Sequence, residues 1–344
     1  PGAMELGRLL GYSQVATGLA LYKYPTLGLA LTMMTKVEAQ VVGSEFQVNT
    51  YTTSDQWDSS AAPLNDGGFV VTWESDGQDG DVYGVYGQRY DSSGVKSGVE
   101  FQVNTYTTSD QQDPSVAPLN DGGFVVTWES SGQDGNAYGI YGQRYDSSGV
   151  KSGVEFQVNT YTTSGQRDPS VAPLNDGGFV VTWESLGQDG DSWGVYGQRY
   201  DSSGVKSGVE FQVNTYTTSD QRDPSVAPLN DGGFVVTWHS NGQDGDSSYG
   251  VYGQKYDSSG VKSGLEFQVN TYTTSLQDSS SAAPLNDGGF VVTWHSNGQD
   301  GDLDGVYGQR YDSNGNPIEL ILSNATNTTS TLLSTPSSVP TGTQ

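Results

Sequence analysis

The ten residues LNDGGFVVTW occur five times in this chain without a single change, and this repetition constrains the fold more than any other feature. The copies begin at Leu64, Leu119, Leu174, Leu229 and Leu285, so they are spaced by 55, 55, 55 and 56 residues. A fixed period of this kind is the signature of a repeat architecture, in which each unit is completed by contact with its neighbours.

Each unit contains four stretches with the character of a β-strand. In the second unit they begin at Glu100, Pro114, Gly123 and Gly139. The stretch GFVVTW carries apolar residues on both of its alternating faces, which predicts a strand covered on both sides. The residues NDGG that precede it accept positive φ, as a tight hairpin requires.

The size of the unit indicates how the copies are arranged. The chain has no cysteine, so disulfides and thiolate sites are excluded. A polar, glycine-rich unit of this length cannot bury enough apolar surface alone. Four strands in about 50 residues are typical of a β-propeller blade. We therefore expect an all-β, five-bladed β-propeller built from near-identical 55-residue four-stranded repeats, with a linear stack of units as the alternative.

The composition divides the chain into three segments. These are an apolar N-terminal extension at 1–42, the five repeats at 43–322, and a tail rich in Ser, Thr and Pro at 323–344. The first residues, PGAM, match a cloning remnant. The two GLAL runs at Gly18 and Gly28 predict a pair of strands, and a signal peptide over residues 26–40 is the alternative. No apolar run is long enough for a membrane-spanning helix.

The charge excludes one class of partner. Lys and Arg number 14 against 40 Asp and Glu, which gives a formal charge of −26. Such a chain repels phosphate backbones, so we expect no nucleic-acid partner.

Four motifs carry a resemblance to known repeats. EFQVNT, DPSVAPLNDGGFVVTW, GQDG and YGQRYDSSG resemble the tandem repeat of large secreted bacterial adhesin-like proteins, often found beside RTX segments that bind calcium. The resemblance covers residues 43–322 and implies an extracellular or cell-surface location. The blade pattern is also similar to that of FG-GAP-type β-propellers, which hold calcium in a DxDxDG loop. Here the loop from Ser75 reads SDGQDGD instead.

The loop after the third stretch of each unit offers candidate calcium ligands. Glycines let its backbone fold around a cation, and calcium prefers such flexible sets of oxygen ligands. The candidate ligands are Asp79, Asp81, Asp134, Asp189, Asp191, Asp244, Asp246, Asp300 and Asp302. The alternative is that Asp and Gly serve here only as turn residues.

The same loop offers candidate ligand-binding aromatics. They are Tyr83, Tyr138, Trp193 and Tyr249, and the fifth unit has Asp304 in their place. Aromatic rings beside carboxylates are suited to stacking on sugars. The tryptophan that ends each GFVVTW stretch alternates with apolar residues, so we interpret it as filling space between sheets.

The near-identity of the five units bears on whether the chain is an enzyme. No GxSxG motif occurs, and glycoside hydrolysis needs two carboxyl groups in unequal environments. Five near-identical units give each carboxyl group nearly the same setting, so we expect no enzyme activity.

We expect instead a recognition or adhesion module, stabilised by calcium and binding carbohydrate through its repeated loops, with a glycan or protein of the cell surface or matrix as partner. Repeated weak sites raise avidity. One alternative is a structural subunit of a filament or matrix that self-associates through residues 9–35. The others are a propeller glycosidase with an unequal carboxyl pair, and a designed or recently duplicated repeat without a specific ligand.

Overall fold

The computed structural model describes residues 45–319. The predicted N-terminal strand pair, the signal peptide, the self-associating segment 9–35 and the tail at 323–344 lie outside the described residues. The described part is built of strands and turns. It contains no helix with the length and apolar character needed to cross a membrane.

Twenty strands follow one another along the described chain. They are β1 (Gln56–Pro63), β2 (Phe69–Asp76), β3 (Tyr83–Tyr90), β4 (Lys96–Gln102), β5 (Gln111–Pro118), β6 (Phe124–Ser131), β7 (Tyr138–Tyr145), β8 (Phe156–Gln157), β9 (Gln166–Pro173), β10 (Phe179–Leu186), β11 (Trp193–Tyr200), β12 (Lys206–Gln212), β13 (Gln221–Pro228), β14 (Phe234–Asn241), β15 (Tyr249–Tyr256), β16 (Phe267–Gln268), β17 (Gln277–Pro284), β18 (Phe290–Asn297), β19 (Asp304–Tyr311) and β20 (Pro317–Ile318).

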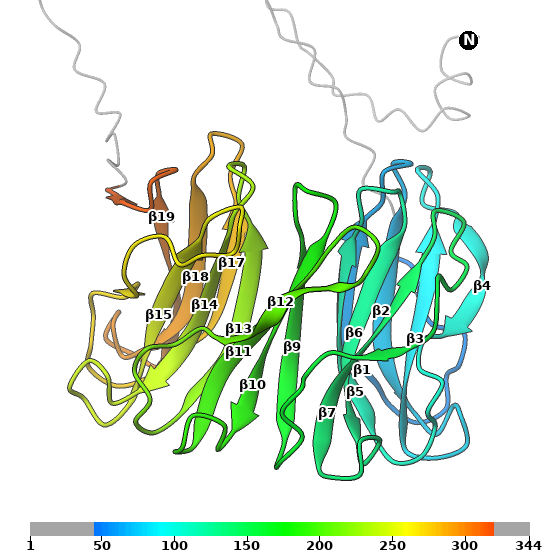
Figure 1. The fold of residues 1–344 in the computed structure, drawn as a ribbon, viewed down its shortest axis with the longest axis horizontal. Coiled ribbons are helices and arrows are strands. Elements are labelled where there is room, and N and C mark those ends of the chain that lie inside the picture. The colour runs from blue at the N-terminus through cyan, green and yellow to red at the C-terminus, as the bar shows by residue number, and fades with distance from the viewer. Residues whose placement is uncertain (1–44, 320–344) are drawn as a thin grey trace, which may run out of the picture. The chain divides into compact units, whose positions relative to one another are not determined.

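These strands form five antiparallel sheets of four, each in sequence order, from β1-β2-β3-β4 to β17-β18-β19-β20. Figure 1 shows the sheets arranged as blades, and we number the blades one to five along the chain. The first strand of each blade is the innermost: β1 packs against β5, β5 against β9, β9 against β13, and β13 against β17. The predicted five-bladed β-propeller of four-stranded repeats is thus confirmed.

The invariant decamer forms the hairpin between the first and second strands of each blade. In the second blade Gly122 has φ +87°, and a Cβ on Gly123 would lie 2.0 Å from the carbonyl oxygen of Tyr145. Neither position accepts a side chain without rearrangement. The Asp121 carboxylate accepts a hydrogen bond from the Gly123 amide at 2.9 Å and closes the turn. The identical letters therefore encode one backbone shape.

Successive blades share an apolar interface, which we call a seam. At the first seam the outgoing face of the first blade places Val70 and Val85 against the incoming face of the second, which includes Phe124 and Trp128. All four side chains are fully buried. The tryptophans that end the GFVVTW stretches are 0–6% exposed in all five blades, which confirms their predicted role as space-filling residues.

Hydrogen bonds also cross each of the four seams between successive blades, from the first blade to the fifth. The amide of Val171 donates to the Ser115 hydroxyl at 3.2 Å, and the Arg144 guanidinium donates to the Ser202 carbonyl at 3.0 Å. The buried Asn159 accepts from the Ile140 amide of the second blade at 2.8 Å and donates to Gln166 of the third at 3.0 Å. Each seam therefore combines an apolar core with specific polar contacts.

Candidate functional site

The innermost strands of all five blades line a polar channel of about 500 Å³. Each strand contributes a short run of Asp, Pro or Ser residues. The residue at the corresponding place is Asp58, Asp113, Asp168, Asp223 or Ser279. The repeat therefore delivers four carboxyl groups to one space, although they are far apart in the sequence.

The backbone at this place is left-handed in every blade. The φ angle is 45° at Asp58, 52° at Asp113, 50° at Asp168, 49° at Asp223 and 51° at Ser279. The pairing register shifts here, for example between Gln112 and Ser115 against β6. A left-handed non-glycine residue stores strain, although Asp tolerates it better than most residues. The same irregularity in five strands turns one polar side chain per blade toward the channel.

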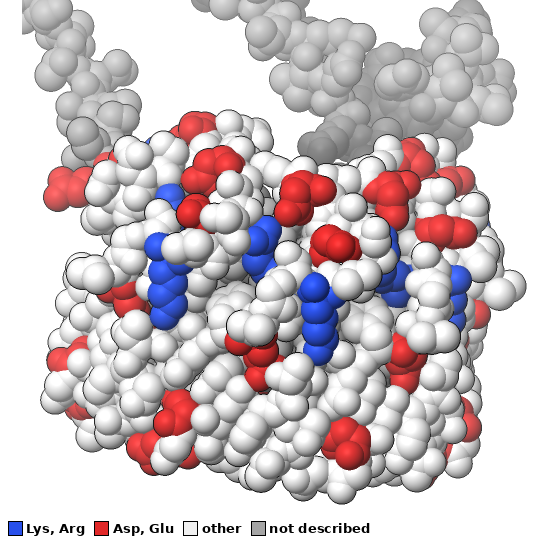
Figure 2. Space-filling model, in the orientation of Figure 1, with Lys and Arg blue, Asp and Glu red and all other residues white. Residues whose placement is uncertain are grey.

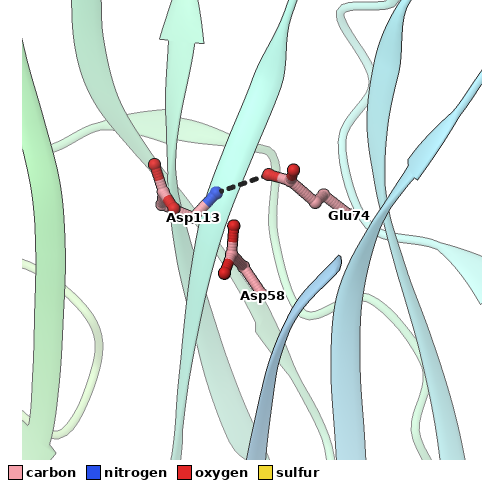
Figure 3. A group of neighbouring side chains, drawn as sticks. All are labelled: Asp58, Glu74 and Asp113. Carbon is pink, nitrogen blue, oxygen red and sulfur yellow. Dashed lines mark hydrogen bonds between the residues drawn. The ribbon is translucent and has the colours of Figure 1, made fainter. Parts of the chain in front are cut away.

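A glutamate from the preceding blade reaches each of three of these aspartates. Glu74 accepts a hydrogen bond from the Asp113 amide at 3.1 Å, as Figure 3 shows. Glu129 accepts from the Asp168 amide at 3.1 Å, and Glu184 from the Asp223 amide at 3.3 Å. These glutamates lie on the second strand of their blade and are at most 3% exposed. Each glutamate therefore crosses a seam between two blades and binds the backbone of a residue in the channel wall.

Three groups of carboxyl groups result, each with oxygen atoms within 4.8 Å of one another. They are Asp58, Glu74 and Asp113; then Asp113, Glu129 and Asp168; then Asp168, Glu184 and Asp223. Two aspartates are shared, so the groups form a continuous arc along one side of the channel. Carboxylate oxygens at this spacing can hold a metal ion.

Burial and mutual repulsion raise the pKa of five carboxyl groups of the arc. Burial, with the charge of neighbouring aspartates, raises the pKa of Glu74 to about 7 and that of Glu129 to about 8. Burial likewise raises the pKa of Asp113 to about 6. It also raises the pKa of Glu184 and of Asp168, which interact with each other. At neutral pH the arc therefore contains both neutral and ionised carboxyl groups.

The arc ends at the fourth blade, where a histidine replaces the glutamate. His239 is 5% exposed, and its Nδ1 lies 3.4 Å from an Asp223 oxygen. Burial lowers its pKa, so the imidazole is mostly neutral at pH 7. In the fifth blade the corresponding His295 side chain is 56% exposed and Ser279 stands in the place of the aspartate. The channel is consequently asymmetric in charge and in proton affinity.

The predicted calcium ligands lie elsewhere, in the loops between the second and third strands. Asp79 accepts from the Asp81 amide at 3.2 Å, and Asp81 accepts from the Ser109 amide of the next unit at 2.8 Å. Equivalent turn bonds hold Asp134, Asp189, Asp244 and Asp300. Within residues 45–319 the acidic groups close enough to share an ion are those of the channel arc. The loop aspartates stay a predicted ligand set.

The four predicted ligand-binding aromatics lie half-buried at the start of the third strand of their blades. The guanidinium carbon of Arg167 lies 4.2 Å from the ring centre of Tyr138, and that of Arg222 lies 4.8 Å from the Trp193 ring. Tyr249 meets the His239 ring edge-on at 4.4 Å. Tyr83 is close enough to Glu74 for that charge to help raise its pKa, although burial contributes most. Their role in binding stays a prediction.

The carboxyl groups of the arc were missed as site residues. A signal for them exists in the sequence: Glu74, Glu129 and Glu184 directly follow the run FVVTW within an interior strand, and an aspartate precedes PS in three inner strands. A charged residue in an interior strand calls for a partner. What the sequence does not reveal is that the partner belongs to the next blade.

Comparisons with known proteins support the fold alone. No protein-family model matches the chain, and no curated protein matches it. The resemblance to adhesin-like, RTX-associated and FG-GAP repeats therefore has no support beyond the propeller architecture. A protein of unknown function from Dyadobacter fermentans has a similar structure, with a TM-score of 0.54 and 12% identity over 76% of this chain and 79% of that one.

A sialidase and an arabinofuranosidase are also among the solved structures that match this chain. A Hadza microbial sialidase has a TM-score of 0.50 and 12% identity, and the match covers 76% of this chain and 57% of the sialidase. An α-L-arabinofuranosidase from Lactobacillus brevis has a TM-score of 0.43 and 13% identity, with 76% and 92% covered.

These findings correct the expectation that the chain is not an enzyme. A sialidase is among the proteins of similar structure, so the propeller fold gives no ground for excluding enzymes. The physical argument against catalysis was also wrong. Near-identical units do not give identical settings, because each carboxyl group also meets the neighbouring blade, and the blades differ at His239 and Ser279. Burial, together with different sets of neighbouring charged groups, gives Glu74, Asp113 and Glu129 pKa values of about 7, 6 and 8.

Proposed function

We propose that the protein binds a neutral carbohydrate at the channel, with the aspartates of the carboxyl arc as its polar contacts and the buried glutamates behind them. The observation that carries the proposal is the arc itself: buried Glu and exposed or half-buried Asp side chains, held within 4.8 Å of one another beside a polar channel of about 500 Å³. A sugar presents many hydroxyl groups, which both donate and accept hydrogen bonds. Ionised carboxylates accept such bonds, protonated carboxyl groups donate them, and Ser hydroxyls do both.

The charge of the protein decides the class of sugar. The channel lining contains Asp and Ser, and the whole chain carries −26. Figure 2 shows acidic side chains spread over the visible face and few basic ones between them. Such a surface repels anions, so sialylated or uronic-acid glycans are disfavoured and neutral glycans are favoured.

Tyr138, one of the predicted ligand-binding aromatics, lies near a glutamate of the arc. Tyr138 lies close enough to Glu129 and Asp110 that, after burial, both charges raise its pKa. Its hydroxyl donates to Asp110 at 3.3 Å while Arg167 covers the ring at 4.2 Å. A sugar that stacks on this ring face would have to displace the Arg167 guanidinium.

Glycoside hydrolysis is a second candidate, favoured by one observation. Glu129, with its pKa raised to about 8, holds a proton at pH 7 beside the more acidic Asp113, whose pKa is raised to about 6. A neutral acid next to an ionised carboxylate is the pair that glycosidic cleavage uses. In this role Glu129 protonates the leaving oxygen as its bond to the anomeric carbon breaks, and Asp113 stabilises the positive charge that develops at that carbon. A water molecule then forms the new bond to the carbon and returns a proton to Glu129.

A cation bound at the arc forms part of the proposal, and oxygen-only ligands favour calcium. Calcium bound only to the folded state would raise the melting temperature in proportion to the logarithm of its concentration. An unchanged melting temperature in calcium and in chelator would remove calcium from the proposal. The extracellular or cell-surface location, adhesion, and a glycan or protein partner stay part of the same proposal.

The test of the proposal is calorimetric titration with a panel of neutral oligosaccharides and one sialylated oligosaccharide. We expect binding of a neutral member that Glu129→Gln and Asp113→Asn each weaken at least about tenfold, or about 1.4 kcal/mol. Asp91→Asn, in an exposed turn, is the matched control. Release of reducing ends from the bound member would decide for hydrolysis. Equal binding by the wild-type protein and both channel variants would refute the channel as the site.

A further inference from the structure

The seam between the fifth and first blades differs from the other four. On the outgoing face of the fifth blade Val306 is 75% exposed, whereas the corresponding Val85, Ile140, Val195 and Val251 are fully buried. The adjacent Ala283 and Thr293 are exposed as well. A face that is buried at four seams is therefore open at the fifth.

The incoming face of the first blade is open in the same way. Trp57 is 55% exposed and Val71 is half-buried, although Val126, which corresponds to Val71 in the second blade, is fully buried. A hollow of about 310 Å³ lies on this face, lined by Trp57, Val71 and Trp73 among others. In the second blade the corresponding surface is covered by Val70 and Val85 of the preceding blade.

Polar contacts also stop at this seam. At the other seams a basic side chain on the third strand donates to a carbonyl of the next blade, as Arg199 does to Ser258 at 2.9 Å and Lys255 to Ser313 at 2.7 Å. The corresponding Arg310 pairs with Asp287 of its own blade. Among the described residues no bond leads from Arg310 to the first blade. Within the described residues, the hydrogen bond that a basic side chain makes to the next blade at the other seams is therefore not formed by Arg310.

We propose that the space between the fifth and first blades is a docking site for a sixth unit of the same 55-residue repeat. Both open faces border the channel, because Ser279 of the fifth blade and Asp58 of the first line it together. Together the two faces correspond to the two sides of the interface found at each of the four seams between successive blades. A further unit presents the matching half to each, so its docking continues an interface already present four times.

The occupant has to be a unit with both of its faces free. The first blade of a second copy of this chain has its outgoing face covered by its own second blade, and the fifth blade has its incoming face covered by the fourth. Neither end blade of a second copy can therefore contact both open faces. Direct contact between the fifth and first blades would bury Val306 as it buries Val251, which is not observed.

Thiol labelling tests this inference directly, because the chain has no cysteine of its own. Val306→Cys reports on the outgoing face of the fifth blade, and Val195→Cys, at a fully buried corresponding position, is the matched control. In the five-unit chain we expect Val306→Cys to react at least about 100-fold faster than Val195→Cys, because a buried thiol reacts only after local opening.

The sixth unit is then supplied by duplicating residues 153–207 directly after Ser207. We expect the reactivity of Val306→Cys to fall to within about tenfold of that of Val195→Cys in this longer chain. Ala61→Cys, on the open face of the first blade, reports independently, with Val116→Cys as its buried control. Slow labelling of Val306→Cys in the five-unit chain would show that another part of this chain, or another copy, already covers the face. That result, or fast labelling of both reporters in the six-unit chain, would overturn the proposal.

Discussion

Glu129 accepts a hydrogen bond from the backbone amide of Asp168 at 3.1 Å, across the seam between the second and third blades. The bond links the interior strand β6 to the channel strand β9, at a place where Asp168 is left-handed with φ 50°. One contact thus joins two blades, satisfies a strained backbone amide, and holds two carboxyl groups next to each other. The stability and the proposed chemistry of the channel depend on the same residues.

The raised pKa of Glu129 predicts how stability depends on pH. Its pKa rises from 4.5 to about 8 on folding, because the side chain is buried among aspartates. Between these values the folded protein keeps a proton that the unfolded chain releases, so the contribution is most favourable below pH 4.5 and is lost as the pH rises through 8. The loss is on the order of 5 kcal/mol.

Urea unfolding of the wild-type protein and Glu129→Gln from pH 5 to pH 9 measures this contribution. The glutamine keeps an acceptor for the Asp168 amide but does not titrate, so we expect the variant to lose less stability as the pH rises. Glu45→Gln removes the same charge from an exposed position and serves as the control. Parallel pH profiles for the wild-type protein and Glu129→Gln would mean that Glu129 titrates normally.

Asn159 is predicted to be one of the costliest polar residues to remove. It accepts from the Ile140 amide and donates to the Tyr161 carbonyl, both at 2.8 Å, and to Gln166 at 3.0 Å. Asn159→Ala leaves these buried groups without partners, which costs about 2–3 kcal/mol. Asn49→Ala is the matched variant at the open end, where the bonds are to Tyr51 and Gln56. In urea unfolding we expect Asn49→Ala to lose less than half as much stability as Asn159→Ala. Equal losses for the two variants would contradict this account of the seam.

Two tryptophans in different environments test whether the cost of removing an aromatic side chain depends on its burial. Trp128 is fully buried at the first seam, and Trp57 is 55% exposed on the open face of the first blade. We expect Trp128→Ala to cost about 3–5 kcal/mol and Trp57→Ala to change stability by about 0.5 kcal/mol or less. Thermal unfolding followed by circular dichroism measures both. Similar losses for the two variants would show that the open face is covered in solution.

The left-handed backbone at Asp113 predicts an unusual order of substitutions. With φ 52°, Asp113→Gly keeps the conformation without strain, whereas Asp113→Val adds about 1–2 kcal/mol of strain. At the neighbouring Gln112, in ordinary strand conformation, valine is favoured over glycine. Chemical denaturation of the four variants checks the reversal. If valine exceeds glycine in stability at both positions, the left-handed conformation of Asp113 does not persist in solution.

The sequence was sufficient for the fold but only partly for the site. The period set by LNDGGFVVTW and the alternation within GFVVTW predicted blades, hairpins and buried tryptophans, because these depend on local pattern and on neighbours of the same kind. The arc was not predicted, because Glu129 and Asp168 are 39 residues apart in the sequence. They come together only through the left-handed backbone at Asp168 and the contact between two blades. The open seam was not predicted either, since identical units imply identical seams and only the arrangement in space shows which face lacks a partner.

The account depends most on the protonation of the channel carboxyl groups at neutral pH, and carbon-13 NMR of selectively labelled glutamate side chains measures it directly. The Glu129 carboxyl resonance is identified as the signal lost in Glu129→Gln, and its chemical shift is followed from pH 4 to pH 10. We expect a midpoint near 8, with burial among aspartates as the cause. A midpoint near the ordinary value of 4.5 would contradict the proposed arc of neutral and ionised carboxyl groups.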